Sequence, residues 1–392
     1  MGFGIYSGSH DPTARGRSAE PIVSPAVARR SVPGLRRAAR APLVVRRVRT
    51  VRVGALRMKA GLEILDQRLR GTKFVALAAR SVMNSPEQTG MDFWSINPYV
   101  GCEFGCTYCY ARYAHRYVVE RARDGGRLSS EEFTEFRGPH GWEAFEHRIF
   151  VKRNVLAALD ADLARYFRSG NNAPIVIGTA TDPYQPAERR FRLTREMLER
   201  LTRYEALSIG IITKSPLVTR DIDVLERLGA RSDLEVYISL ISADAALVRR
   251  MEARSPGPTA RLRALRKLTA AGINAGLIVA PVLPGISDDV AHLEALFQAA
   301  REAGARFIHA GPLRMYPGMR ARFLPVLAAQ FPHLSDRYAR AYTRHASAPP
   351  EYAAALKRRI QRLQEKFGFP VNRGMEDRYR QRRPAPQAEL EL

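Results

Sequence analysis

The sequence has few cysteines and no long hydrophobic run. Its 3 cysteines lie between Cys102 and Cys109, too few and too close together for a secreted disulfide framework. The longest apolar stretch, Ala275 to Ile286, is short and contains two prolines, which excludes a membrane span. No amino-terminal segment has the charged and then apolar order of a secretory signal. These absences predict a cytoplasmic protein in a thiol-reducing compartment.

Negative charge is also scarce relative to positive charge. The chain of 392 residues has 63 Lys plus Arg against 39 Asp plus Glu, a formal net charge of +24, and 45% of its residues are hydrophobic. The length and the apolar share suit two average globular domains or one large barrel. The charge is compatible with a polyanionic partner such as nucleic acid. Only seven of the basic residues are Lys, however, and a strong Arg bias also arises from a GC-rich coding sequence.

Residues 1–57 differ in composition from the rest of the chain. They contain twelve Arg, no Lys and only two acidic residues, Asp11 and Glu20, in a background rich in Pro, Ser and Ala. Such a composition cannot bury a core and predicts a disordered segment. A solvated tail, a nucleic-acid-binding arm and an organelle transit peptide are all consistent with it. A true start nearer Met58 is a further alternative.

Strand-like apolar runs alternate with amphipathic stretches from about residue 90. Strands of this kind, separated by helices of about 10–15 residues, indicate βαβ units in a parallel sheet. Right-handed crossovers curl five or six such units into an open or closed barrel, with a doubly wound sheet as the alternative. The predicted strands are 175–179, 208–213, 234–240, 275–280 and 306–310, and the predicted helices between them are 193–204, 221–228, 259–271 and 287–303.

The predicted fold class is therefore α/β, a partial (β/α)6 barrel of TIM type with parallel strands and a helical extension at the carboxyl end. After residue 315 the pattern changes to helices and polar turns, with a last helix near 352–367. We expect four segments: the disordered 1–57, a lead-in over 58–91, the core barrel over 92–315, and a helical extension with a tail over 316–392.

All three thiols lie in one loop with the spacing C-x3-C-x2-C, formed by Cys102, Cys106 and Cys109. A compact loop can direct three sulfur atoms at one point, so the spacing predicts a metal centre. One interpretation is a structural zinc site, because His115 follows six residues after Cys109 and would complete a Cys3His tetrahedron. The other is an iron–sulfur cube that leaves one iron open to an exchangeable ligand.

The cysteine loop, with Tyr108 before its last cysteine, resembles the cluster loop of the radical S-adenosylmethionine (SAM) superfamily. Further motifs, in order over roughly residues 92–315, resemble its spore photoproduct lyase-like branch. These are Val151-Lys-Arg-Asn154, Thr181-Asp-Pro-Tyr-Gln-Pro-Ala-Glu188, Leu193-Thr-Arg195, Ile212-Thr-Lys-Ser215, Arg220-Asp-Ile-Asp223 and Pro281-Val-Leu-Pro-Gly-Ile286. If the chain belongs to that branch, His115 is an ordinary helix residue and not a metal ligand.

The resemblance implies a [4Fe–4S] cluster on Cys102, Cys106 and Cys109, whose open iron chelates the amino and carboxylate groups of SAM. Lys214 would meet the methionine carboxylate with a compact positive charge; the alternative is a solvated loop lysine. Ser239 would offer its hydroxyl to the carboxylate or the ribose, unless it is a plain strand serine.

Further residues are implied around the other parts of SAM. Thr181 and Asp182 would lie near the methionine amino group, with a helix-capping role as the alternative for Asp182. Ile278 belongs to a G-x-I-x-G-like pattern whose Ile packs on the adenine, although Ala280 replaces the second Gly. Tyr108 would contact the adenine edge or shield the cluster, or else is a core aromatic.

Glu252 resembles the acidic residue of the family's Glu-Pro-Arg turn, with Ala253 in place of the Pro. Arg261 follows nine residues later, either as a partner of Glu252 or as a surface helix residue. The expected chemistry is reductive cleavage of SAM, which gives a 5′-deoxyadenosyl radical that removes a hydrogen atom from an unreactive C–H bond of a substrate. A flavodoxin- or ferredoxin-type protein would supply the electron.

The resemblance does not identify the substrate. Spore photoproduct lyases use a further cysteine as hydrogen-atom donor, and this chain has no fourth cysteine. Either a tyrosine takes that role or the reaction differs. Nucleic acid is the leading substrate class, and a zinc- or iron–sulfur-stabilised nucleic-acid-binding protein without turnover is the alternative function. Two groups of arginines are consistent with a nucleic-acid substrate. Solvated helix faces would explain the same arginines without a ligand. The groups are Arg189, Arg190, Arg192 and Arg195, and Arg378, Arg380, Arg382 and Arg383.

Overall fold

A curved sheet of parallel strands organises the chain. The computed structural model describes residues 64–67, 71–126, 128–137, 141–170 and 173–371, all within one compact unit. In these residues six parallel strands have the order β11–β10–β9–β8–β7–β4, and β3 pairs antiparallel with β4. Their bounds are β3 Met83–Asn84, β4 Trp94–Ile96, β7 Ile175–Ile177, β8 Ser208–Thr213, β9 Asp233–Ser239, β10 Ala275–Val282 and β11 Ile308–Pro312.

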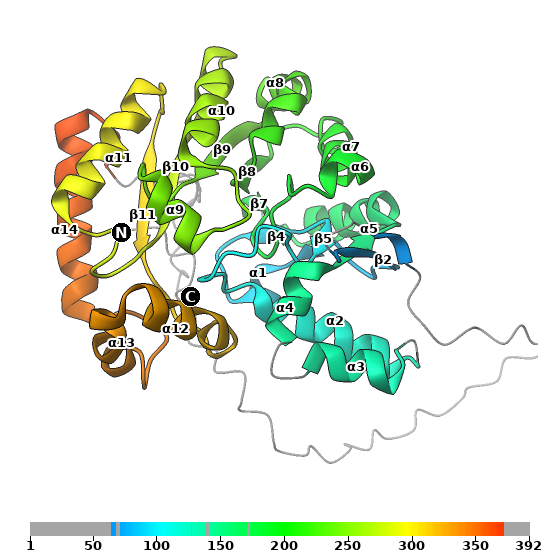
Figure 1. Ribbon diagram of the computed structural model, residues 1–392. Helices are drawn as coiled ribbons and strands as arrows, with labels where there is room; N and C mark the ends of the chain where they lie inside the picture. Colours follow the sequence, from blue (N-terminus) through cyan, green and yellow to red (C-terminus); the bar gives the residue numbers. More distant parts are fainter. Residues whose placement is uncertain (1–63, 68–70, 127, 138–140, 171–172, 372–392) are drawn as a thin grey trace, which may run out of the picture. The chain divides into compact units, whose positions relative to one another are not determined.

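Helices connect successive parallel strands and lie along the outer side of the sheet (Figure 1). The predicted partial barrel is therefore confirmed, including the alternation of strands with amphipathic helices. The crossovers are α6 Glu188–Phe191 and α7 Leu193–Leu201, the 3-10 helix η1 Pro216–Asp221 and α8 Ile222–Gly229, α9 Ala245–Met251 and α10 Pro258–Ala270, and α11 Val290–Glu302.

Alternate strand residues face opposite sides of the sheet, because side chains of a strand have a period of two. Val236 and Leu277 belong to the main core, which the helices cover. Tyr237 and Ile278, one position further along, pack with Phe307 in a separate small cluster on the other face. In barrels of this type ligands lie at the carboxyl ends of the strands, where this inner face ends.

A long insertion between β4 and β7 carries the cysteine loop. Its strands β5 and β6 join β1 and β2, which precede β4 in the chain, in a second sheet of order β1–β2–β6–β5, where β2 and β6 are parallel. The elements of this region and of the lead-in are β1 Ile64–Gln67, β2 Lys73–Leu77, α1 Pro86–Thr89, β5 Tyr99–Val100, α2 Arg112–Asp124, α3 Ser130–Arg137, α4 Gly141–His147, β6 Arg148–Lys152 and α5 Val155–Arg168.

Carboxyl-terminal helices cover the outer edge of the large sheet. The Gln364 side chain of α14 donates a hydrogen bond of 2.8 Å to the carbonyl oxygen of Ile308 in β11. The ring of Phe367 lies 6.0 Å from that of Phe297 on α11. The edge strand is thereby protected from pairing with another chain. The helices of this extension are α12 Pro317–Gln330, η2 Pro332–Leu334, α13 Ser335–Ala341 and α14 Pro350–Phe367.

The predicted disordered segment 1–57 and the late arginine group at 378–383 lie outside the described residues. The predicted segment boundaries stay predictions. Among the helices within the described ranges, none combines the length and the hydrophobicity that a membrane-spanning segment requires.

Asp162 on α5 joins the lead-in to the barrel. One oxygen of its buried carboxylate accepts hydrogen bonds from the backbone N–H groups of Val82 and Met83, at 2.7 and 2.9 Å, and from the Ser81 hydroxyl at 2.9 Å. Both N–H groups belong to fully buried residues, so these donors depend on the carboxylate as their acceptor.

We therefore expect Asp162→Ala to lower the free energy of unfolding by about 2–4 kcal/mol, since two buried donors lose their acceptor. Asp160→Ala is the matched control on the same helix. Its side chain is 43% exposed and pairs with Arg200, so the loss should stay below about 1 kcal/mol. Urea denaturation measures both values, and equal losses would contradict the assigned role of Asp162.

Candidate active site

The cysteine loop runs from the end of β5 to the start of α2. At Gly101, directly after β5, the backbone lies too close to α4 for any side chain. Gly101 has a φ of +92°, and a Cβ atom there would lie 2.8 Å from the carbonyl oxygen of Phe145. This close approach lets the N–H of Cys102 donate to the same oxygen at 2.9 Å. Cys102 and Cys106 are buried and Cys109 is half-buried, all as free thiols.

The segments that follow β7 and β9 hold the loop from two sides. Near β7, the Thr181 hydroxyl donates to the carbonyl oxygen of Gly101 at 2.6 Å. Gln185 donates to the same oxygen at 3.1 Å and accepts from the N–H of Glu103 at 3.0 Å. Thr181, predicted near the SAM amino group, therefore uses its hydroxyl to anchor the cysteine loop.

On the β9 side, the backbone N–H and the hydroxyl of Thr107 donate to the carbonyl oxygen of Met251, at 3.0 and 3.1 Å. The sulfur atom of Cys106 lies 3.7 Å from the hydroxyl oxygen of Ser255. The loop is thus fixed against segments far away in the sequence.

Arg112 at the start of α2 fixes the middle of the loop. Its guanidinium donates to the carbonyl oxygen of Cys106 at 2.8 Å and forms a buried ion pair with Glu146 at 2.6 Å. Arg254 also pairs with Glu146. Sequence reasoning missed Gln185, Ser255 and Arg112. Gln185 lies within the motif that begins at Thr181, whereas no local pattern marks the other two.

The three sulfur atoms lie close enough together to interact electrostatically. Burial raises the pKa of Cys102 well above its usual value, and the charges of Asp182 and of the other two cysteines raise it further. Burial raises the pKa of Cys106 to about 12, although the Lys214 cation opposes this. In the part of the chain that the structure describes, no three His, Cys, Asp or Glu side chains are already gathered around a metal-sized space. The donor set nevertheless fits an iron–sulfur cluster, which is held by thiolates.

Lys214, directly after β8, extends its ammonium group toward the loop. The Nζ atom lies 2.9 Å from the Ser239 hydroxyl oxygen, 4.0 Å from the Glu252 carboxylate and 5.7 Å from the centre of the Tyr108 ring. Burial lowers the pKa of Lys214, but the negative charges of Cys106 and Glu252 outweigh burial and raise it. The side chain, 15% exposed, is thus a half-buried cation held by Ser239 and Glu252 rather than the solvated loop lysine of the alternative.

A fully buried ion pair between Glu252 and Arg261 lies next to the Lys214 ammonium group. The Glu252 carboxylate accepts hydrogen bonds from the Arg261 guanidinium and the Tyr108 hydroxyl, and Arg261 also donates to the carbonyl oxygen of Ser239 at 2.8 Å. Burial alone would raise the pKa of Glu252, but the charges of Arg261 and Lys214 outweigh it and hold the pKa below its usual value. Arg261 is therefore the partner of Glu252 and not a surface residue.

Asp182 connects the ends of two neighbouring strands. Its carboxylate accepts hydrogen bonds from the N–H of Lys214 and the hydroxyl of Thr213, both at 2.7 Å, and from the N–H of Tyr184 at 2.9 Å. Burial raises its pKa, although these donors oppose the shift. The structure thus gives Asp182 a role in fixing the Lys214 backbone. Its predicted approach to SAM stays a prediction.

Ile278 lies on the inner face of β10, opposite Ser239 of β9 in the strand register. It is 4% exposed and packs with Tyr237 and Phe307. The predicted adenine contact would therefore form on an apolar surface beside the Lys214 and Ser239 pair.

His115 does not join the cysteines. Its Nε2 atom lies 2.9 Å from the carbonyl oxygen of Arg148, and its ring packs against Phe136, Phe145 and Phe150. Burial lowers the pKa of His115 to about 4. A Cys3His zinc site would require this ring to leave its apolar surroundings.

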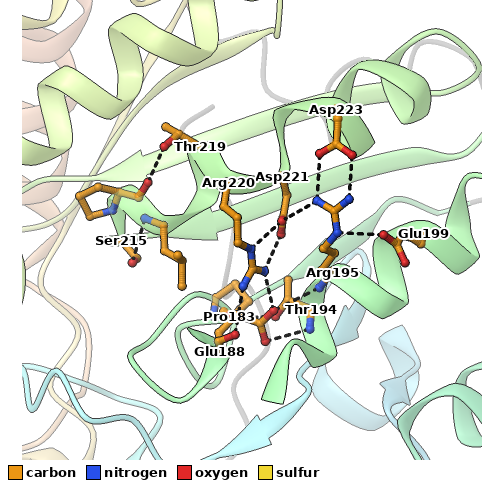
Figure 2. Close-up of polar contacts among 12 residues, drawn as sticks. Pro183, Glu188, Thr194, Arg195, Glu199, Ser215, Thr219, Arg220, Asp221 and Asp223 are labelled. Atoms are coloured by element: carbon orange, nitrogen blue, oxygen red, sulfur yellow. Dashed lines mark hydrogen bonds and ion pairs between the residues drawn. The ribbon is translucent and has the colours of Figure 1, made fainter. Parts of the chain in front are cut away.

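Residues of three sequence motifs meet in one ion-pair network (Figure 2). Arg195 on α7 pairs with Asp221 at 3.0 Å and with Asp223 at 2.7 Å. Arg220 pairs with Asp221 at 2.7 Å and with the fully buried Glu188 at 2.9 Å. The network ties the segment after β7 to the segment after β8. Arg195, one of the arginines considered for nucleic acid, is already engaged by carboxylates.

Comparison with known proteins gives the family. The sequence profile of the Radical SAM superfamily matches residues 96–297. The chain is 31% identical over 299 residues to an uncharacterized protein of Mycobacterium tuberculosis, covering 76% of this chain and 82% of that protein. It is 27% identical over 216 residues to an uncharacterized protein of Methanocaldococcus jannaschii, covering 55% of this chain and 70% of that one.

The fold is similar to that of spore photoproduct lyases. One solved structure, complexed with dinucleoside spore photoproduct, has a TM-score of 0.54 and 16% identity over 75% of this chain and 79% of that one. A mutant lyase with bound AdoMet gives a TM-score of 0.53 and 15% identity over the same shares. With its cysteine motif and its matching profile, the chain belongs to the radical SAM superfamily, whose cofactors are a [4Fe–4S] cluster and SAM.

Proposed function

We propose that this enzyme cleaves SAM reductively at the cysteine loop and abstracts a hydrogen atom from a nucleic acid. Cys102, Cys106 and Cys109 would hold the cluster, and Lys214 and Ser239 would bind SAM. One observation carries the proposal: the half-buried ammonium of Lys214 lies beside the cysteine loop, 2.9 Å from the Ser239 hydroxyl oxygen. A half-buried cation next to three thiols suits an anionic cofactor group, because a nearby opposite charge favours the charged form of that group. When bound, the cluster and SAM together supply a 5′-deoxyadenosyl radical.

The residues of the chain would bind and orient this cofactor pair. Lys214 offers a point charge to the methionine carboxylate, since its three donors are only partly used by Ser239. Asp182 holds the Lys214 backbone in position. Ile278, within its apolar cluster, would face the adenine and exclude water from the reacting atoms. Tyr108 is held by Glu252 and would cover the same region.

Charge and fold support the nucleic acid as substrate class. The formal net charge of the chain is +24, and one structurally similar lyase is complexed with a dinucleoside spore photoproduct. The reaction should nevertheless differ from that lyase reaction, because no cysteine outside the cluster loop is present to return a hydrogen atom. Radical SAM enzymes require an electron donor, and a flavodoxin- or ferredoxin-type protein would serve here.

Cluster binding is tested by anaerobic reconstitution with iron and sulfide. We expect about four iron and four sulfide per chain. Cys106→Ala should lose the cluster, whereas His115→Gln should retain it because His115 packs away from the thiols. Iron and sulfide analysis with electron paramagnetic resonance measures this. Stoichiometric zinc without sulfide would refute the cluster, and an intact cluster without release of 5′-deoxyadenosine under dithionite would favour the non-catalytic alternative.

Lys214→Ala should weaken binding of SAM about ten- to a hundredfold, because one charge-assisted hydrogen bond is worth roughly 1.5–3 kcal/mol. The iron content should not change, since Lys214 is not a cluster ligand. Equilibrium dialysis with labelled SAM measures the dissociation constant. Lys267→Ala is the control, as it removes the same charge from an exposed position of α10. An unchanged constant for Lys214→Ala would remove this residue from the site without refuting the enzyme.

A further inference from the structure

Tyrosines recur directly after the last cysteine of the loop. The ring centres of Tyr110 and Tyr113 are 6.4 Å apart in a stacked arrangement, and those of Tyr113 and Tyr117 are 6.1 Å apart edge to face. Tyr316, which precedes α12, lies 6.3 Å from Tyr110. We call Tyr110, Tyr113, Tyr117 and Tyr316 the tyrosine row. It begins beside Cys109 and follows one face of α2.

The inner end of the row is fixed and the outer end is open. Tyr110 is half-buried, and its hydroxyl donates to the carbonyl oxygen of Thr179, in the segment after β7. Tyr113 and Tyr117 are 44% and 52% exposed, and they are two of the six exposed large hydrophobic side chains in the described residues. Two neighbouring aromatic rings are thus partly exposed to solvent, in a row that leads to the cysteine loop.

Positive charge accompanies these rings. Helix α2 contains four arginines against Glu120 and Asp124. Arg116 pairs with Glu120 at 2.7 Å, and Arg123 lies 4.1 Å from the ring centre of Phe133. Arg121, one turn after Tyr117 on the same face, is exposed and has no ion pair within the described part of the chain. One cation is therefore available at the outer end of the tyrosine row.

Exposed aromatic rings with a neighbouring guanidinium are the chemistry that binds unpaired nucleotides, because bases stack on the rings and a phosphate pairs with the cation. We propose that the tyrosine row binds a single-stranded segment of nucleic acid, with bases on Tyr113 and Tyr117 and a phosphate at Arg121. This proposal rests on the proposed function, since it names how the substrate reaches the site. An unpaired strand suits a reaction inside a barrel, because a base in a duplex must first leave the stack.

The test is fluorescence anisotropy of the reconstituted full chain with a fluorescein-labelled 12-nucleotide single strand and with the corresponding duplex. We expect tighter binding of the single strand. Tyr113→Leu and Tyr117→Leu should each weaken that binding about tenfold or more, and Tyr113→Phe should retain it because stacking needs only the ring. Arg121→Gln should lower the slope of log Kd against log salt by about 0.7, whereas the tyrosine variants should leave this slope unchanged.

Phe167→Leu is the matched control. Phe167 on α5 is 45% exposed, and its ring stacks at 5.3 Å on Tyr204, which makes it an aromatic pair of similar exposure away from the row. Its loss should not change the anisotropy. Thermal unfolding and iron content verify that each variant is folded, and Tyr117→Leu, at the more exposed position, keeps the test valid if Tyr113→Leu unfolds.

Several outcomes would overturn the proposal. Equal binding of strand and duplex, or unchanged binding by both Leu variants, would show that the rings do not stack on bases. Variants that retain strand binding but lose reduction by a flavodoxin would identify the row as a docking surface for the electron donor instead. Release of 5′-deoxyadenosine with dithionite and SAM is independent of the row. A wild type that cleaves SAM but binds no strand refutes this inference and leaves the proposed cleavage of SAM standing, whereas one that binds the strand at the row but never cleaves SAM refutes the proposed reaction and leaves the binding surface standing.

Discussion

The buried ion pair between Glu252 and Arg261 is the interaction on which the candidate site depends. Both side chains are fully buried, and between them they contact the cysteine loop through Tyr108 and the end of β9 through the Ser239 carbonyl group. Loss of one partner from such a pair costs about 3–5 kcal/mol, because the remaining charge stays in a medium of low polarity. The pair therefore fixes the loop, the strand end and the surroundings of Lys214 as one unit.

The rest of the site follows from the ends of parallel strands. Thr181 and Asp182 follow β7, Lys214 follows β8, and Ser239 ends β9, so the parallel direction of these strands brings them to one edge of the sheet. The network of Arg195 and Arg220 with their carboxylates then fixes the segments after β7 and β8 against each other. Backbone hydrogen bonds alone would leave these loops free to move, and precise placement of Lys214 requires such support.

The large positive charge of the chain has more than one use. Arg112, Arg195, Arg220 and Arg261 are engaged by carboxylates inside the protein, where they hold loops and helices together. The count of basic residues thus overstates the charge available to a partner. A residue such as Arg121, exposed beside open aromatic rings, contributes more to a binding hypothesis than the total does.

The sequence by itself determined the parallel α/β fold and the cysteine motif, because strand and helix periods and the C-x3-C-x2-C spacing are local properties. It also singled out Lys214 through a short motif. Only the tertiary structure decided that Arg261 pairs with Glu252, that His115 packs away from the thiols, and that Gln185, Ser255 and Arg112 anchor the cysteine loop. These contacts join residues far apart in the chain. Their partners are set by how the strand ends converge, and no local pattern encodes that convergence.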